Sequence, residues 1–401
     1  MKKTLTFCLL IIGHFTFSQS TRAAGELSGA KTITGIIKDI TSSLPVESVS
    51  IGVSNSNLGT ISNEEGKFRI TLPENSNKIE FSHLYFKLES YTIKPNDTEI
   101  EIFLTPKSFV LEEVVINHKP GKDLLIDAVN ASKDKLEKSI VLNTYYREFV
   151  NVDNKYTSFS DGLIDFYVKR KSGTSDLHVK QSRVFDLKDE NASEREKAIQ
   201  SGNINDVRDA VINSYNFKGL SSVLKSEHYY FNVETKTDEN GSSIEIITIE
   251  PKENVEAEMI YTGTVVYDAK TKLILDIDMR FSPEHKKFNP IHNLLIAKIK
   301  FNDFVRKSKF KIDGDKYIMV YNQIKINAYL KFGKMINNTF ESTYDMTTLD
   351  YKEGEFKLDK DKKYRESSLF KNGNKYTEEF WKKQNVILLS EKEENIINSL
   401  K

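Results

Sequence analysis

Short runs of alternating apolar and polar residues, separated by turn residues, dominate the chain between residues 31 and 105. Thr32–Lys38 alternates and is rich in β-branched residues, and Val49, Ile51 and Val53 alternate again after a break. Further runs of this kind continue to Leu104, and Pro, Gly, Asn or Asp ends most of them. The pattern predicts about seven short strands, which is typical of a small β-sandwich.

The most specific local signal lies in the run Gly59–Phe68. A short strand is followed by the polar turn Asn63-Glu64-Glu65-Gly66, and a second strand leaves that turn at Lys67. Gly66 can adopt a positive φ because it has no Cβ. The run therefore predicts a tight connection between two strands of the sandwich.

Several of these glycine and turn positions resemble, in order and interval, the carboxypeptidase-like regulatory domain, a transthyretin-like sandwich of exported Gram-negative proteins. The matching residues are Thr34-Gly35 with Asp39, Leu44-Pro45-Val46, Val49-Ser50-Ile51, Gly59-Thr60, Gly66-Lys67-Phe68 and Leu111–Ile116. The family often has Asp where this chain has Asn63, and Asn can make the same turn hydrogen bonds. The resemblance implies an interaction or packing module and not a catalyst.

A second domain is predicted after a linker at residues 106–121. Leu125, Val129 and Leu136 recur at helical spacing, which predicts an amphipathic helix over residues 122–139. Consecutive strands joined by hairpin turns follow to residue 350, and residues 351–401 read as a charged loop with C-terminal helices. We therefore expect a mainly β protein: a seven-stranded sandwich, then an α+β domain with a large curved antiparallel meander and a few packed helices. This second domain resembles the C-terminal region of uncharacterised exported proteins, and its curved sheet is similar to the lipoprotein-carrier half-barrel.

The N-terminus has the form of a secretory signal peptide over residues 1–19, with Lys2 and Lys3 before a short apolar run. The single cysteine, Cys8, lies inside that run, so the mature chain should contain no thiol and no disulfide. No later stretch approaches the roughly 20 apolar residues of a membrane helix. We expect an exported protein that is periplasmic or associated with the outer membrane.

Overall charge is balanced, with a formal net charge of +0 and 29% charged residues. This composition gives no support to nucleic-acid binding.

Catalytic and metal-binding motifs are missing from the sequence. The His-x-x-Glu pair of zinc carboxypeptidases does not occur, and neither does the Gly-x-Ser-x-Gly elbow of serine hydrolases. The nearest group to a metal site is Glu284, His285 and His292, but the spacing of the histidines fits no standard structural zinc pattern, so we favour a polar loop with imidazoles that face solvent. Acid pairs with two-residue spacing, Asp276 with Asp278 and Glu256 with Glu258, are more typical of a solvated strand face. We assign no catalytic, cofactor or metal residue and predict that the protein is not an enzyme.

Aromatic residues are the remaining candidates for ligand binding. They recur along the predicted meander, where they could form a platform for a sugar, lipid or peptide or simply fill the core: Tyr229-Tyr230-Phe231, Tyr261, Tyr267, Tyr317, Tyr321, Tyr329 and Tyr344. Trp381 is expected to anchor the C-terminal segment on the sheet. Our leading hypothesis is an exported non-catalytic protein that binds a ligand, an outer-membrane receptor or a lipoprotein. An uncharacterised hydrolase and a structural spacer without a ligand are the alternatives.

Overall fold

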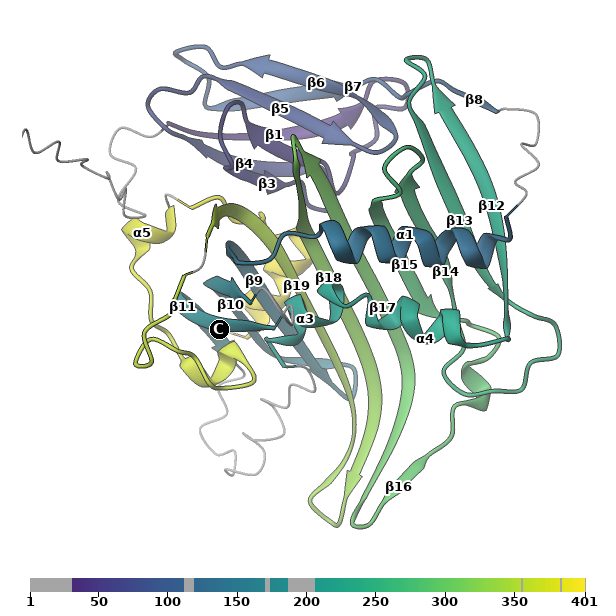
Figure 1. Ribbon diagram of the computed structural model, residues 1–401. Coiled ribbons are helices and arrows are strands. Elements are labelled where there is room, and N and C mark those ends of the chain that lie inside the picture. The colour runs from purple at the N-terminus through teal and green to yellow at the C-terminus, as the bar shows by residue number, and fades with distance from the viewer. Residues whose placement is uncertain are drawn as a thin grey trace, which may run out of the picture.

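The computed structural model describes residues 31–111, 119–169, 174–186, 206–354, 356–382 and 384–400. The expected signal peptide, Cys8, the Glu112–Ile116 part of the family motif and residues 187–205 lie outside these ranges. The described chain forms a small β-sandwich above one end of a large curved sheet (Figure 1). The expectation of a mainly β protein with these two parts is confirmed.

The sandwich contains the seven expected strands in two sheets. One sheet has the order β4-β1-β7, with β1 and β7 parallel, and the other has the order β3-β2-β5-β6. Inward residues of both sheets, such as Ile33, Phe68 and Phe81, are fully buried between them. The strands are β1 (Lys31–Asp39), β2 (Ser50–Val53), β3 (Gly59–Ile61), β4 (Lys67–Leu72), β5 (Lys78–His83), β6 (Phe86–Thr92) and β7 (Glu99–Leu104).

The turn between β3 and β4 has the predicted geometry. Gly66 has a φ of 70°, and an added Cβ would lie 2.5 Å from the carbonyl oxygen of Ile37. The Asn63 side-chain oxygen accepts hydrogen bonds from the backbone N–H groups of Glu65 and Lys67, at 3.0 and 2.9 Å. Asn63 thus serves the turn as expected. Its amide nitrogen also donates to the carbonyl oxygen of Leu388, at 3.3 Å, which an ionised Asp could not do.

The second domain is built on one twelve-stranded sheet in which all neighbours are antiparallel. Its order is β11-β10-β9-β19-β18-β17-β15-β14-β13-β12-β8, and the short β16 pairs with β17. Hairpins connect most neighbours, whereas the β9–β19 pair joins segments far apart in sequence. The strands are β8 (Phe109–Leu111), β9 (Ile140–Val152), β10 (Lys155–Val168), β11 (Ser175–Asp186), β12 (Tyr229–Asp238), β13 (Ser243–Pro251), β14 (Tyr261–Asp268), β15 (Ile274–Phe281), β16 (His292–Leu294), β17 (Ala297–Asp313), β18 (Lys316–Phe332) and β19 (Ile336–Glu353).

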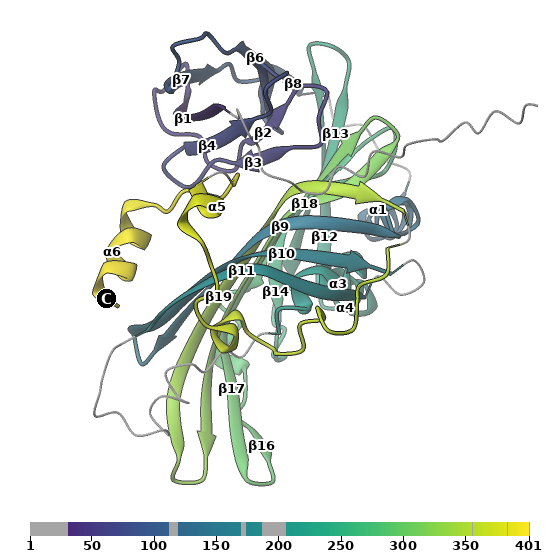
Figure 2. The same ribbon diagram turned by 90° about the vertical axis from the view of Figure 1, so that its left-hand side faces the viewer.

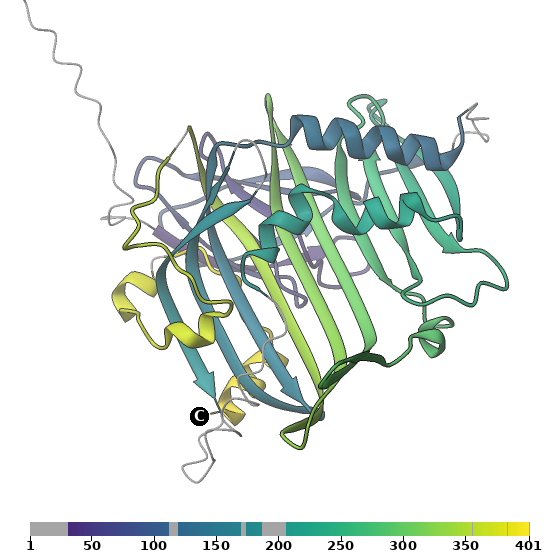
Figure 3. The same cartoon turned by 60° about the horizontal axis from the view of Figure 1, so that its bottom comes forward.

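Three helices cover one face of this sheet: α1 (Gly121–Lys135), α3 (Asp209–Tyr215) and α4 (Lys218–Lys225). Figure 3 shows them lying across the strands. Leu125, Val129 and Leu136 of the predicted apolar stripe are all buried in the core beneath them. The helix ends at Lys135 and not at Ser139, because Ile140 already begins β9.

The C-terminal segment covers part of the opposite face, as Figure 2 shows for α5 (Glu378–Lys382) and α6 (Glu391–Ser399). Trp381 is 7% exposed and packs in a cluster with Tyr145 of β9 and Ile61 of β3, as its anchoring role requires. The same segment hydrogen-bonds to the sandwich, since Arg69 donates to the carbonyl oxygens of Trp381 and Gln384. This segment therefore ties the two domains together.

Two segments carry structure beyond the expected one. Within the predicted linker, Phe109–Leu111 adds β8 to the outer edge of the sheet by pairing with β12. At the other boundary, β19 continues past residue 350 to Glu353. In both places a neighbouring strand offers unpaired backbone groups, and hydrogen bonding to them extends the sheet.

Candidate functional site

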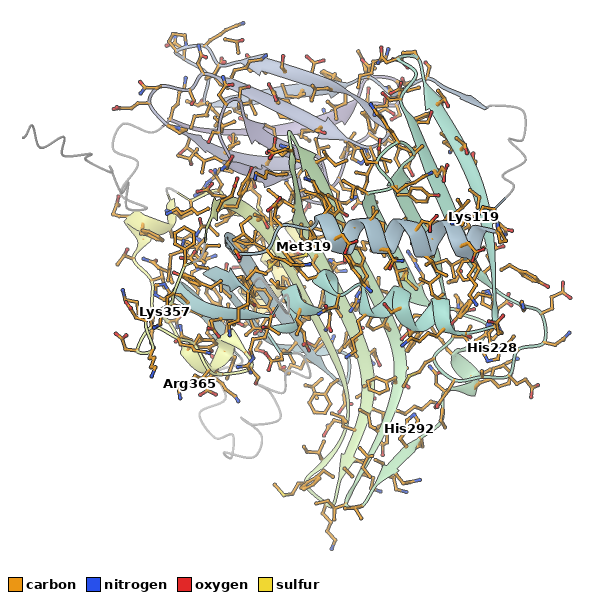
Figure 4. The ribbon with its side chains drawn as sticks, viewed as in Figure 1. Lys119, His228, His292, Met319, Lys357 and Arg365 are labelled. Carbon is orange, nitrogen blue, oxygen red and sulfur yellow. The ribbon has the colours of Figure 1, made fainter. Side chains whose placement is uncertain are left out.

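The metal-like group of the sequence is not assembled by the fold. His292 Nε2 lies 3.2 Å from Glu258 Oε2, whereas His285 Nδ1 lies 2.8 Å from the hydroxyl of Ser282. Figure 4 shows His292 on β16, toward the lower end of the molecule. Within the described ranges, no cluster of three or more His, Cys, Asp or Glu residues could hold a metal ion.

The acid pairs are held by nearby cations or exposed. Asp276 forms an ion pair with Lys309 at 2.5 Å, and Asp278 pairs with Arg280 at 3.0 Å. Glu256 is exposed, and Glu258 pairs with His292 as described above. Neither arrangement presents two free carboxyl groups to a common substrate position.

Most of the candidate aromatic residues fill the core. Tyr267, Tyr317 and Tyr344 are at most 1% exposed and pack beneath the helices. Tyr321 lies on the opposite face, in the cluster with Trp381. Tyr230, in the run Tyr229-Tyr230-Phe231, is exposed to solvent. Because most of the other candidate aromatic residues are buried, they do not form one continuous binding platform with it.

A buried ionic network holds the C-terminal segment on the sheet. The guanidinium of Arg147 on β9 makes two hydrogen bonds to Asp345 of β19, at 2.7 and 2.8 Å, and a third to Glu393 of α6 at 3.0 Å. Burial disfavours the charged form of Arg147 and lowers its pKa. The negative charges of Asp345 and Glu393 have the larger effect, so the pKa of Arg147 is raised. Glu393 also caps α6 by accepting from the backbone N–H of Ser390.

Beside this network, Asp161 of β10 receives hydrogen bonds from Arg183 of β11 and from the hydroxyl of Tyr145. Burial raises the pKa of the Asp161 carboxyl even though Arg183 works against this effect. The Arg183 guanidinium also lies 4.1 Å from the centre of the Trp381 ring, in a cation–π contact. These charges are satisfied internally and have a structural role.

Glu148 is a buried acid on the helix-covered face. Its carboxylate accepts from Tyr146, Ser160 and Ser368 at 2.7–3.0 Å. Burial raises its pKa, and these hydrogen bonds reduce the shift. Glu148 is 1% exposed, so its carboxyl group is separated from solvent.

His83 lies at the end of β5, next to the large sheet. Its ring packs against Phe86, and burial together with the nearby Lys309 and Lys107 lowers its pKa to about 4. A neutral imidazole is therefore part of the contact between the two domains near neutral pH.

The candidate binding site is a cleft of about 650 Å³ between the sandwich and the upper end of the large sheet. Its size falls within the roughly 300–1,000 Å³ typical of ligand sites. One wall comes from β2, β3 and the loop 54–58, with Glu80, Ser82 and Leu88 beside them. The other wall comes from the β17–β18 turn and the end of β19, which point toward the sandwich in Figure 1.

Both walls present hydrogen-bonding groups to the cleft. On the sandwich side, the hydroxyl of Ser54 donates to Glu80 at 2.9 Å. On the sheet side, Lys316 pairs with Glu353 at 2.9 Å. Burial, with Asp313 and Glu353 nearby, raises the pKa of Tyr351 to about 12, so this phenol remains a neutral donor and acceptor.

A second hollow, of about 460 Å³, lies between β9, β10 and the chain after β19. Its lining includes Phe356 and the lysines Lys169, Lys357, Lys360 and Lys363, of which Lys357 is labelled in Figure 4. Asp176 forms ion pairs with both Lys169 and Lys363, and these pairs reduce the positive charge of the hollow.

The cleft could not be predicted from the sequence. The turn Asp313-Gly314-Asp315 reads plainly as a hairpin, but the sequence contains no sign that it faces residues 50–61. A cleft between domains depends on their relative placement, which rests on the C-terminal segment and on direct contacts such as the ion pair between Lys87 and Glu239.

In the comparison with protein families, residues 33–116 match the family described as CarboxypepD_reg-like domain. This confirms the resemblance seen in the sequence and identifies the sandwich. The match ends before α1 and includes just the edge strand β8 of the large sheet, so it does not classify that sheet. Among curated proteins, none matches this chain.

Several solved structures show a limited likeness. A LolA superfamily protein from Nitrosomonas europaea has 8% identity and a TM-score of 0.21, covering 59% of this chain and 95% of its own. An outer membrane lipoprotein-sorting protein domain from Vibrio parahaemolyticus has 12% identity and a TM-score of 0.23, covering 60% and 94%. Lipovitellin has 12% identity and a TM-score of 0.23 over 56% of this chain, which spans just 26% of lipovitellin. Such low scores establish no common fold, and a common fold would not imply a common ligand.

None of the described helices has the length and apolar character needed to cross a membrane.

Proposed function

We propose that this chain is an exported, non-catalytic binding protein of the cell envelope, and that its ligand occupies the cleft between the two domains. One observation carries the proposal: the cleft is walled by both domains and offers hydroxyl, amide, carboxylate and ammonium groups beside apolar ones. Convergent polar groups in a concave site are what ligand recognition requires.

The chemistry of the lining favours a polar ligand such as a glycan or a peptide. Ser54, Asn57 and Tyr351 can exchange hydrogen bonds with hydroxyl or amide groups, and Leu58 and Leu88 can contact apolar parts. The Asn57 side chain donates a hydrogen bond to the carbonyl oxygen of Tyr351 at 3.4 Å and so joins the two walls directly, which limits the entropy lost on binding.

Gly52 permits a direct test. It lines the cleft, and nothing lies within 4 Å of an added Cβ, so Gly52→Trp should fill the cleft without disturbing the strand. Glu99→Trp is the matched control, since Glu99 is exposed on the other sheet of the sandwich.

A photo-crosslinking amino acid at Leu88, which lines the cleft and is 67% exposed, would label the ligand in native envelope. We expect an adduct in the otherwise unchanged protein and with Glu99→Trp, and its loss with Gly52→Trp. An adduct that persists at the same yield in Gly52→Trp would show that the cleft is not the binding site.

A further inference from the structure

The end of the large sheet farthest from the cleft carries a cluster of exposed apolar side chains. The β16–β17 turn is made by Leu295 and Ile296, of which Leu295 is fully exposed and Ile296 is 72% exposed. The β18–β19 turn adds Phe332 and Met335. Ala297 of β17 pairs directly with Phe332 of β18, so the two turns lie side by side at one tip. Figures 1 and 2 both show this tip projecting away from the rest of the molecule.

The conformation of Leu295 is unusual for such a position. Its φ is 39°, in the left-handed region that Gly or Asn adopts at lower cost than a bulky side chain. A residue suited to the turn alone would be small or polar. The chain instead places a strained, fully exposed leucine at the apex, and burial outside this protein would compensate for that cost.

The charge around the tip has one sign. Residues 286–302 and 326–340 contain no Asp or Glu, and they contain six lysines: Lys286, Lys287, Lys298, Lys300, Lys331 and Lys334. Lys298 and Lys331 are direct cross-strand partners, an arrangement in which like charges repel. Acidic side chains lie farther from the two turns. Asp303 forms an ion pair with Lys286, and Glu258 forms one with His292. Asp153 accepts hydrogen bonds from the side chain of Asn338 and the backbone N–H of Thr339.

From this geometry we propose that the tip, defined as Leu294–Ala297 with Lys331–Ile336, docks onto a lipid bilayer that contains anionic headgroups. Apolar apices surrounded by lysines match the two layers of such a surface: side chains enter the acyl boundary while the ammonium groups remain among the phosphates. Because the interface of a lipid bilayer is fluid, a convex tip of two turns can insert without a complementary pocket. A specific protein partner would require about 800 Å² per side, which two narrow turns do not offer.

Docking in this way would orient the molecule. β17 has 17 residues and runs from the tip at Ala297 to the cleft at Asp313, which corresponds to roughly 50 Å of extended strand. The ligand cleft would therefore be held away from the bilayer. The tip does not depend on the proposed function of the cleft, and Gly52→Trp should leave bilayer binding unchanged.

Vesicle flotation tests the proposal, using phosphatidylcholine vesicles with and without phosphatidylglycerol. We expect the full chain to float with the anionic vesicles and to be released by salt. Leu295→Asn with Ile296→Ser should abolish flotation and leave the hairpin intact, because Asn tolerates the left-handed turn position. Lys298→Gln with Lys331→Gln should weaken binding about 25-fold, given about fivefold for each lysine near an anionic surface.

Ile40→Asn with Leu44→Ser is the matched control, since it removes similar exposed apolar side chains from the sandwich. This control should float as the unchanged protein does. Leu295→Trp adds a second measurement: its emission should shift to the blue on vesicle addition if the apex is inserted. Absence of flotation, flotation that survives Leu295→Asn with Ile296→Ser, or photo-crosslinks from position 295 to a polypeptide and not to lipid would overturn the proposal.

Discussion

Replacement of Arg147 by Met should detach the C-terminal segment from the sheet. The side chain is of similar length, but it removes the cation that Asp345 and Glu393 share, and both carboxylates are largely buried, at 4% and 19% side-chain exposure. Breaking a buried ion pair by removing one partner costs about 3–5 kcal/mol, because the remaining charge loses its compensation. Part of this cost can be avoided if α6 separates from the sheet and Glu393 regains water.

Trp381 makes this event observable, since it is the single tryptophan of the chain and packs edge-on against Tyr145 in the same covered face. Urea unfolding followed by Trp381 emission should show a transition destabilised by about 3–5 kcal/mol in Arg147→Met. The matched control neutralises all three groups, as Arg147→Met with Asp345→Asn and Glu393→Gln, and should recover much of the loss because no uncompensated charge remains. A loss below about 1 kcal/mol, or a neutralised variant no more stable than the single one, would refute the reasoning.

Three further changes have defined outcomes. The pKa of His83 is lowered from 6.5 to about 4, so unfolding takes up a proton as the pH falls between these values and stability is lost across that window; thermal unfolding of His83→Gln should show a smaller loss, and an identical pH profile would contradict this. Gly66→Ala should destabilise the sandwich by about 2 kcal/mol or more in thermal unfolding, through its positive φ and the backbone contact, whereas Gly52→Ala, with open space around it, should be neutral. Asn63→Asp should keep the turn but place a carboxylate oxygen against the carbonyl of Leu388, at a cost of about 1–3 kcal/mol; faster proteolysis of the C-terminal segment would reveal it, and an unchanged rate would argue against this bond.

Local signals identified the sandwich correctly for a physical reason. The Asn63–Gly66 turn depends on one side-chain oxygen and one residue without a Cβ, all within four positions, so its geometry can be read without the rest of the fold. The apolar stripe of α1 could be predicted in the same way, because Leu125 and Val129 lie on one side of a single helix.

The pairing of strands far apart in the sequence could not be predicted. Arg147 and Asp345 are 198 positions apart, and neither residue carries a sign that β9 will lie beside β19. The sequence of a strand shows the alternation of apolar and polar residues, but it does not show which strand it pairs with. A strand that is covered on both faces lacks this alternation too, as the almost continuous burial of β9 shows.

The sandwich family, most hairpin turns and the apolar stripe of α1 can be predicted from the amino-acid sequence, because these features depend on residues close together in the chain. Packing in three dimensions sets which sheet edge each strand joins, where Trp381 covers the sheet, and that residues 50–61 face the β17–β18 turn across a cleft. It also brings Leu295 and Phe332 together at one tip. These features arise from packing between segments far apart in sequence, whose free energy depends on shape and burial and leaves no local pattern.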